Sequence, residues 1–373
     1  MAGSQNPVMA NIDGEVVFER AVLDRYLESL KSLAISEIRK EVDSFRESIS
    51  TKVTLDAPPG KNGLIGFDES TQTGGDFRVK HAILDRQLEQ ISGSRTEDRA
   101  IYYIERLRKY VSSDRKEGLD LNRWQDYDEI ITDSFWNVES RDRSEMHDAG
   151  YWGNFVPLIP RQLMLRYTKP GDLVLEPFMG AGTTLFEAVS IDRNYLGMDI
   201  IGELVEKARA KVSGSMTKSK YFLYNGNSCE TDFSSLLREN GFEASDLVIM
   251  HPPYHDIIHF TDDPRDLSNA SSLDGFLLQF SRIAASCVST LRPGGYLAAV
   301  IGDKYASGEW VPLGFLVMQE LARTGLILKS IVVKNFNRTR GKRGQERLWR
   351  YRALAGGYYV FKHEYILVFR KPA

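Results

Sequence analysis

Short apolar runs alternate with stretches of helical periodicity beyond about residue 131, and this alternation restricts the fold more than any other feature of the chain. The runs have the length of buried strands and lie at 172–175, 195–198, 221–224, 246–250 and 296–301. Helical patterns separate them at 184–190, 203–212 and 275–290. Strands that alternate with helices predict an α/β fold, with a doubly wound and mostly parallel sheet. Two later patterns, at 326–334 and 358–369, are typical of the antiparallel edge of such a sheet.

The first 130 residues lack this alternation and carry helical periodicity instead. One helical pattern runs over 14–50 and a second over 78–112. The segment 57–76 between them is rich in Gly and Pro and indicates a connecting loop. We therefore expect an N-terminal helical accessory region at 1–130, followed by an α/β domain at 131–373.

Composition narrows the class of protein. The chain has 373 residues, 42% of them hydrophobic, and a net charge of −3, which suits one large domain and a smaller region. Two cysteines exclude a disulfide framework and indicate a reducing compartment. No apolar run approaches the roughly 20 residues that span a bilayer, and the chain does not open on a signal-peptide pattern. We therefore expect a cytoplasmic protein without a membrane segment.

Residues 173–184 read LVLEPFMGAGTT, which is a strand, a glycine turn and the start of a helix. Gly180 and Gly182 remove side chains where a backbone must come close to a ligand. Thr183 or Thr184 can cap the following helix, whose free N–H groups favour a carboxylate. Asp199 ends the next strand, where an acidic residue is placed to hold ribose hydroxyls. Asn227 follows the third strand and is a candidate for contact with an adenine edge.

The residue sequence of this turn distinguishes a dinucleotide-binding site from another kind of nucleotide-binding site. A dinucleotide fingerprint has a third glycine, which is missing here. The segment 176–184, Glu-Pro-Phe-Met-Gly-Ala-Gly-Thr-Thr, instead resembles the D-P-F-x-G-S-G-T-T motif of amino-group DNA methyltransferases. Glu176 stands where the family has Asp, and Ala181 where it has Ser. The resemblance implies S-adenosylmethionine as cofactor, and the implied contacts are Glu176, Pro177, Phe178, Gly180, Gly182, Thr183, Thr184, Asp199 and Asn227.

The fourth strand pattern runs directly into His251-Pro252-Pro253-Tyr254. A Pro-Pro pair continues neither a helix nor a strand ladder, so it forms a stiff, extended exit from the sheet. The four residues resemble the [D/N/S]-P-P-[Y/F/W] motif of adenine-N6 and cytosine-N4 methyltransferases, which implies that all four are catalytic and that Tyr254 stacks on an extruded base. His251 departs from the pattern, but a neutral imidazole still accepts one hydrogen bond from the target amine. Its ordinary pKa predicts a rate that falls on the acid side of neutrality.

Metal binding and methylation at carbon 5 of cytosine are two alternatives to methylation of an amine. His251, His255 and His259 recur every four residues and raise the possibility of a metal site. The two prolines prevent one helix from aligning all three, and no zinc-type motif stands nearby, so no metal is expected. Methylation at carbon 5 of cytosine needs a thiolate nucleophile, commonly after a proline. Neither Cys229 nor Cys287 follows a proline, and we expect both to be packing residues.

A basic segment at 334–352 predicts the nucleic-acid surface, since eight of its nineteen residues are Lys or Arg in a chain of negative net charge. The candidate contacts with DNA are Arg338, Arg340, Lys342, Arg343, Arg347, Trp349 and Arg350. We expect the target-recognition segment to span about 335–357. A solvated charged loop is the alternative explanation.

The resemblance covers about residues 131–373. The ending 362–371 is similar to the closing strand of the family, and 152–162 stands where the family has a cofactor-contacting helix. The resemblance implies a site-specific DNA methyltransferase of the restriction-modification type that acts on a flipped base, with adenine N6 slightly favoured over cytosine N4. The alternatives are methylation of an RNA base, methylation of protein glutamine, and a non-catalytic DNA-binding protein that kept the fold. A homodimer through the N-terminal helices stays open, as does a restriction partner.

Overall fold

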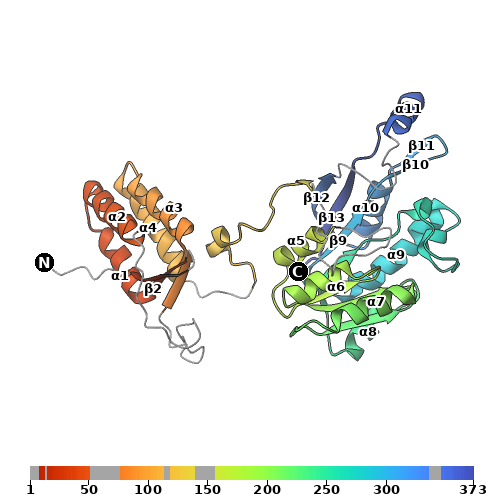
Figure 1. Cartoon of the computed structure of the whole chain (residues 1–373), viewed down its shortest axis with the longest axis horizontal. Helices are drawn as coiled ribbons and strands as arrows, with labels where there is room; N and C mark the ends of the chain where they lie inside the picture. Colours follow the sequence, from red (N-terminus) through yellow and green to blue (C-terminus); the bar gives the residue numbers. More distant parts are fainter. Residues whose placement is uncertain (1–7, 13–14, 51–75, 113–117, 139–155, 336–345) are drawn as a thin grey trace. The chain divides into compact units, whose positions relative to one another are not determined.

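The computed structural model describes residues 8–12, 15–50, 76–112, 118–138, 156–335 and 346–373. The chain divides into two compact units, Met1–Glu129 and Ile130–Ala373 (Figure 1). No helix within the described ranges is both long and apolar enough to cross a membrane.

The N-terminal unit combines a helical core with a small antiparallel sheet of order β1-β2-β3. Its elements are β1 (Val8–Ile12), β2 (Glu15–Glu19), α1 (Arg20–Leu30), α2 (Ile35–Ser50), β3 (Asp76–Lys80), α3 (His81–Ser92), α4 (Glu97–Ser112) and the 3-10 turn η1 (Leu121–Asp126). Apolar side chains of all four α-helices meet in one buried cluster, which includes Leu27, Val42, Leu88 and Ile104.

The two long helical patterns expected in this unit are each interrupted, which corrects the prediction. The pattern at 14–50 contains β2, α1 and α2, and the pattern at 78–112 contains the end of β3, α3 and α4. The apolar period continues across the break between α1 and α2, because both helices turn their apolar faces to the same core. The strand β2 carries Val16, Val17 and Phe18 in succession, and all three are buried, which is typical of a strand.

The second unit is built on an eight-stranded sheet, and the predicted α/β fold class is confirmed. The strand order is β4-β12-β13-β9-β8-β5-β6-β7. The strands are β4 (Phe135–Asn137), β5 (Leu173–Glu176), β6 (Asn194–Asp199), β7 (Tyr221–Asn225), β8 (Ser245–Met250), β9 (Leu291–Ile301), β12 (Ile327–Asn335) and β13 (His363–Arg370). The pairs from β7 to β9 are all parallel.

The two later strand patterns, now β12 and β13, form the antiparallel part of this sheet near one of its edges, as expected. Strand β13 pairs antiparallel with β9 on one side and with β12 on the other. Strand β12 pairs in turn with the short edge strand β4, in parallel. The short strand β4 adds one further strand outside this antiparallel part, which the apolar pattern did not indicate.

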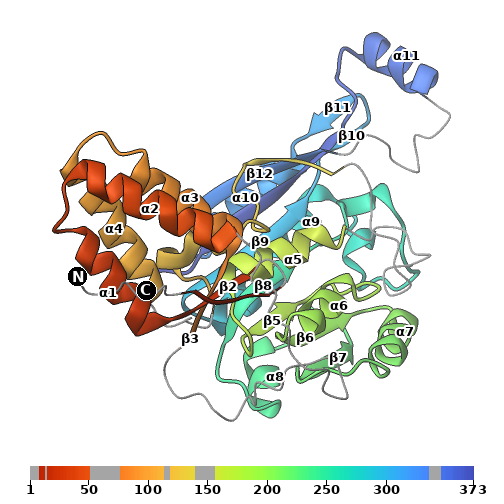
Figure 2. The same cartoon turned by 60° about the vertical axis from the view of Figure 1, so that its left-hand side comes forward.

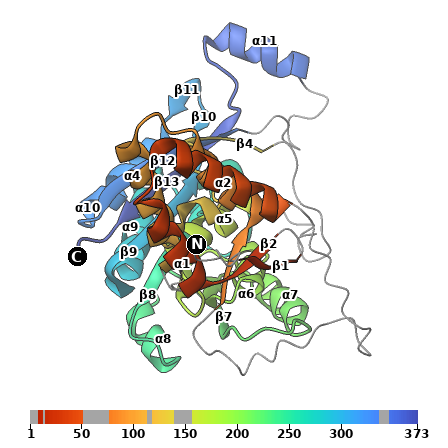
Figure 3. The same ribbon diagram turned by 90° about the vertical axis from the view of Figure 1, so that its left-hand side faces the viewer.

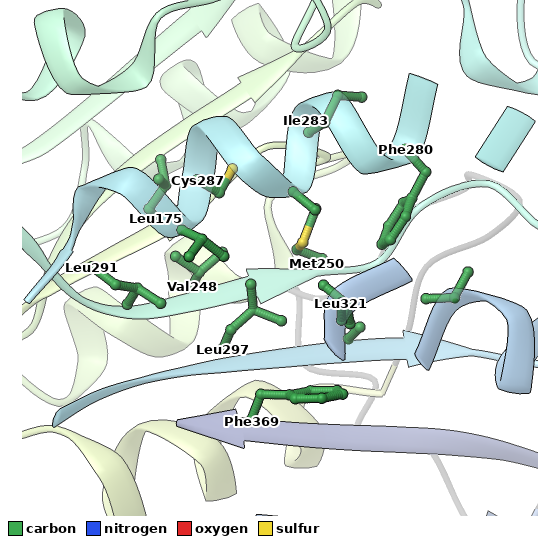
Figure 4. Close-up of a cluster of buried hydrophobic side chains, with 14 of the residues drawn as sticks. Leu175, Val248, Met250, Phe280, Ile283, Cys287, Leu291, Leu297, Leu321 and Phe369 are labelled. Atoms are coloured by element: carbon green, nitrogen blue, oxygen red, sulfur yellow. The ribbon is translucent and has the colours of Figure 1, made fainter. Parts of the chain in front are cut away.

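Two layers of helices cover the sheet, as a doubly wound fold requires. One face packs against α5 (Leu158–Tyr167), α6 (Thr183–Ser190) and α7 (Gly202–Val212), and the other against α8 (Phe233–Glu239), α9 (Leu273–Thr290) and α10 (Leu313–Arg323) (Figures 2 and 3). Successive strand residues alternate between the faces, so that Leu247 lies in the first core and Val248 in the second. Figure 4 shows the second core, where Met250, Phe280 and Phe369 meet.

Smaller elements extend the unit beyond the sheet. They are the 3-10 turns η3 (His255–Ile257) and η4 (Leu267–Asn269), the hairpin β10 (Lys304–Ala306) with β11 (Glu309–Val311), and α11 (Glu346–Gly356). The hairpin and α11 lie at the same end of this unit in all three views (Figures 1, 2 and 3).

Candidate active site

The glycine turn between β5 and α6 uses a backbone that only glycine adopts readily. Gly180 has a φ of 50° and Gly182 a φ of 85°, both in the left-handed region that side chains disfavour. A Cβ on Gly182 would also lie 3.1 Å from the Cβ of Ala208 in α7. Gly182 therefore serves the turn and the packing of α7 together. It is the N-cap of α6, and no side-chain hydrogen bond caps the helix within the described residues.

Asp199 at the end of β6 uses one carboxylate oxygen to hold this turn and the other to hold the backbone that follows β6. Its Oδ2 accepts a hydrogen bond from the backbone N–H of Gly180 at 2.7 Å, and its Oδ1 accepts one from Ile201 at 2.9 Å. Burial raises the pKa of Asp199 to about 6, although these backbone donors act in the opposite direction. In the folded chain, the residue predicted to hold ribose hydroxyls thus fixes the turn against β6.

Glu176 turns its carboxyl group into the protein, and the residue is fully buried. One carboxyl oxygen accepts a hydrogen bond from Thr184 Oγ1 at 2.7 Å, and the other accepts one from the hydroxyl of Tyr195 at 2.5 Å. Burial raises the pKa of Glu176 to about 8 against the effect of these two hydroxyls. The helix-capping role expected for Thr184 is therefore wrong, because its hydroxyl serves Glu176.

Gly197 makes the contact between Tyr195 and Glu176 possible. It pairs with Glu176 across β5 and β6, and a Cβ there would lie 2.4 Å from the hydroxyl oxygen of Tyr195. The ring of Tyr195 thus passes over Gly197 to reach the carboxyl group. The sequence reading did not identify Tyr195 or Gly197 as part of the site.

The ends of β5, β6 and β7 are connected by further hydrogen bonds. Ser228 Oγ donates to the backbone carbonyl of Pro177 at 2.6 Å, and Asn225 Nδ2 donates to that of Asp199 at 3.0 Å. Asn227 Oδ1 accepts from the backbone N–H of Cys229 at 3.0 Å. Phe178 is half-buried against the core. The predicted cofactor residues therefore come together at one edge of the sheet.

The residues His251 to Tyr254 leave β8 at the same edge, since β8 lies beside β5 and runs parallel to it. The rings of His251 and Tyr254 meet edge to face, with centroids 5.8 Å apart. Burial lowers the pKa of His251 to about 4, with Glu364 raising it and Lys334 lowering it further. The expected loss of activity just below neutrality is therefore corrected, because this imidazole stays neutral until far lower pH.

Glu364 and Lys334 are neighbours of this exit that the sequence reading missed. Glu364 Oε2 accepts a hydrogen bond from the hydroxyl of Tyr254 at 3.0 Å, and Glu364 Oε1 lies 2.8 Å from Lys334 Nζ. Both charged residues are buried. One signal was available in the sequence, because a Lys and a Glu interrupt two apolar strand patterns, and buried charges of opposite sign tend to pair.

The three histidines considered for a metal have different surroundings. His255 Nε2 lies 3.1 Å from the carbonyl of Ala270, and its Nδ1 lies 2.7 Å from Lys304 Nζ. His259 is exposed and contacts Asn269 and Asp262. Over the described part of the chain, no group of three or more possible ligands gathers. Both cysteines are free thiols there, with Cys287 buried and Cys229 half-buried.

The predicted nucleic-acid contacts fall in two groups. Arg338, Arg340, Lys342 and Arg343 lie outside the described residues. Arg347, Trp349 and Arg350 lie on α11, where the two arginines are exposed and Trp349 is half-buried. The guanidinium of Arg352 stands 5.2 Å above the ring of Trp349. Of the predicted cofactor-contacting segment 152–162, residues 152–155 also lie outside, and the rest leads into α5.

Comparison with known proteins relates the chain to DNA methylases. The N6_N4_Mtase family, described as DNA methylase, matches residues 83–210. This range includes the glycine turn and Asp199 and ends before His251. The type II methyltransferase M.Cfr9I of Citrobacter freundii is 35% identical over 82 residues, which are 22% of this chain and 26% of that protein. M.BglI of Bacillus subtilis is 38% identical over 64 residues, 17% of each chain. The chain spans about a quarter or less of the length of these relatives.

Solved structures give a weaker likeness. TrmN from Thermus thermophilus has 18% identity and a TM-score of 0.38, over 61% of this chain and 52% of its own. A methyltransferase from Pyrococcus furiosus has 14% identity and a TM-score of 0.36, over 59% and 84%. The family match at 83–210 and the type II relatives thus make the chain similar to amino-group DNA methyltransferases over part of its length, and they support S-adenosylmethionine as its cofactor.

Proposed function

We propose that this chain transfers a methyl group from S-adenosylmethionine to an exocyclic amine of a base in DNA, with adenine N6 ahead of cytosine N4. One observation carries the proposal: the glycine turn and the exit at 251–254 leave adjacent parallel strands, β5 and β8, at the same edge of the sheet. Ligands of doubly wound sheets bind at the carboxyl ends of their strands. A cofactor on the first motif would therefore lie beside a base on the second.

The donors and acceptors at the turn fit S-adenosylmethionine. The first N–H groups of α6 lack a side-chain cap in the described structure, and such groups favour a carboxylate. Asp199 supplies hydrogen-bond acceptors at the end of β6, and the hydroxyl groups of a ribose would donate to them. When bound, this cofactor supplies an electrophilic methyl group.

The residues of the exit act on the target amine. A neutral His251 accepts one hydrogen bond through its unprotonated nitrogen and so orients the amine. Tyr254 offers a ring on which the extruded base stacks. The amine needs no covalent link to the protein, so orientation and exclusion of water are what these residues contribute. The basic face of α11, with Arg347 and Arg350, supplies contacts with phosphates.

The substrate is tested by measuring transfer of a tritiated methyl group onto DNA, RNA and protein side by side. Label on DNA supports the proposal, and digestion to nucleosides with mass spectrometry then separates N6-methyladenine from N4-methylcytosine. Label on RNA or on protein alone would replace DNA by that substrate. Absence of label on all three would identify a non-catalytic protein.

His251 is tested by single-turnover methylation from pH 5.5 to 8.5 at saturating cofactor. His251→Ala should keep cofactor binding and lose most of the methyl transfer, since only the contact with the amine is removed. The matched control is His259→Ala, which changes an exposed histidine of the following loop. With the pKa of His251 at about 4, the wild-type rate should show no step near pH 6.5 from this residue. A near-normal rate in His251→Ala would make His251 structural.

A further inference from the structure

The buried pair Lys334–Glu364 lies where the sheet meets the catalytic exit. The two residues face one another directly across β12 and β13, and their side chains are 7% and 11% exposed. Taking two charges out of water is costly, and apolar residues of similar volume often stabilise such a position equally well. Stability alone therefore gives a weak reason for an ion pair at this place.

The second oxygen of the Glu364 carboxylate indicates what the pair does. It accepts the hydroxyl of Tyr254, a residue 110 positions away in the sequence. The same ring is closely packed from the side, because a Cβ on Gly302 would lie 2.9 Å from Tyr254 Cε2. Pro253 stiffens the backbone just before it. The ring is thus held at its hydroxyl, along one edge and through its backbone.

A tyrosine that only stacks on a base does not need this arrangement. Stacking uses the face of the ring, which phenylalanine offers equally. The hydroxyl is needed only if the ring must keep one orientation. The buried carboxylate binds this hydroxyl, and the lysine neutralises the carboxylate. Small errors in the placement of a reacting group reduce rates strongly even when binding is kept.

We propose that Glu364 and Lys334 are positioning residues, which hold the hydroxyl of Tyr254 so that its ring presents one fixed face to the extruded base. The proposal rests on the proposed function. Lys334 acts through Glu364, and Glu364 acts through Tyr254. The effects of substituting these three residues on the rate of methyl transfer are therefore not independent.

The test compares Tyr254→Phe and Glu364→Gln in the full chain by single-turnover methylation at saturating cofactor and DNA. Each should lower the rate by roughly 10- to 100-fold, while the dissociation constant for S-adenosylmethionine stays within about twofold. The matched control is Tyr110→Phe in the N-terminal unit, which removes another buried tyrosine hydroxyl from a carboxylate, that of Asp126. The control should keep the wild-type rate.

The double variant separates positioning from simple stabilisation. If Glu364 acts through Tyr254, Glu364→Gln should change the rate little once Tyr254→Phe is present. Losses that multiply would overturn the proposal, because Glu364 would then act by another route. Should Glu364→Gln fail to fold, Lys334→Met combined with Glu364→Leu replaces the pair by apolar side chains and should be folded and slow.

Two failures can be told apart. If the wild-type protein methylates none of DNA, RNA and protein, both the proposed function and this inference are overturned. An active wild type whose Tyr254→Phe and Glu364→Gln variants keep near-normal rates overturns the positioning role alone.

Discussion

The proposed cofactor turn, at 177–182, and the proposed catalytic exit, at 251–254, each lie beside one buried glutamate at the edge of the sheet, and each glutamate accepts a hydrogen bond from a tyrosine hydroxyl. Tyr195 donates to Glu176 at 2.5 Å, and Tyr254 donates to Glu364 at 3.0 Å. The second partner of the carboxyl group differs between the two glutamates. Glu176 has the hydroxyl of Thr184, whereas Glu364 has the ammonium of Lys334.

This difference sets the charge that each site contains. Burial raises the pKa of Glu176 to about 8, because its two hydroxyl partners offset the loss of water only in part. A lysine beside the carboxylate instead makes the buried charge tolerable. The cofactor turn thus rests on a group that changes charge near neutrality, and the exit rests on an ion pair.

The largest expected effect concerns the dependence of stability on pH. In the folded chain Glu176 stays protonated up to a pH of about 8, whereas in the unfolded chain it ionises near the ordinary glutamate pKa of 4.5. Its contribution to stability is therefore complete below about pH 4.5 and is lost as the pH rises to about 8. At about 1.4 kcal/mol per pKa unit, this is on the order of 5 kcal/mol.

Glu176→Gln cannot ionise, so its free energy of unfolding should fall less than that of the wild type between pH 5 and 8. Denaturant unfolding at several pH values measures the difference. Glu239→Gln, an exposed glutamate on α8, is the control and should follow the wild type. Parallel curves for Glu176→Gln and the wild type would show that Glu176 is ionised in the folded chain.

The next effect compares truncation of the two glutamates. Glu364→Ala removes the carboxylate that neutralises buried Lys334 and should cost roughly 3–5 kcal/mol. Glu176→Ala leaves only hydroxyls without their acceptor and should cost about 1–3 kcal/mol. Denaturant unfolding at pH 7 gives both values. Equal losses would remove the distinction between an ion-paired site and a hydroxyl-bonded one.

The smallest effect concerns Asp199, which connects the cofactor turn to β6. Asp199→Ala should weaken S-adenosylmethionine binding by roughly 1–3 kcal/mol, because hydrogen bonds to a charged group and the support of Gly180 are both lost. Calorimetric titration of the folded variant measures this. Asp192→Ala, an exposed aspartate in the turn before β6, serves as control. Unchanged affinity in Asp199→Ala would move ribose recognition to another residue.

Local pattern was enough to predict much of this molecule. The period of apolar residues located the five strands from β5 to β9 and the helices α6, α7 and α9, because strand and helix periods depend on residues a few positions apart. The glycines at 180 and 182 marked a turn whose conformation side chains disfavour. The motif at 251–254 lies directly after β8, where the pattern placed it.

Other features depended on which strands become neighbours, and no local pattern states that. The inward direction of Glu176 depends on Tyr195, which reaches it only because Gly197 stands opposite in the paired strand. Tyr254 meets Glu364 across 110 positions because β13 enters the sheet between β9 and β12. The sequence alone indicated which residues are candidates for the chemistry. The tertiary structure decided their protonation, since burial and cross-strand partners set the pKa of Glu176 and of His251.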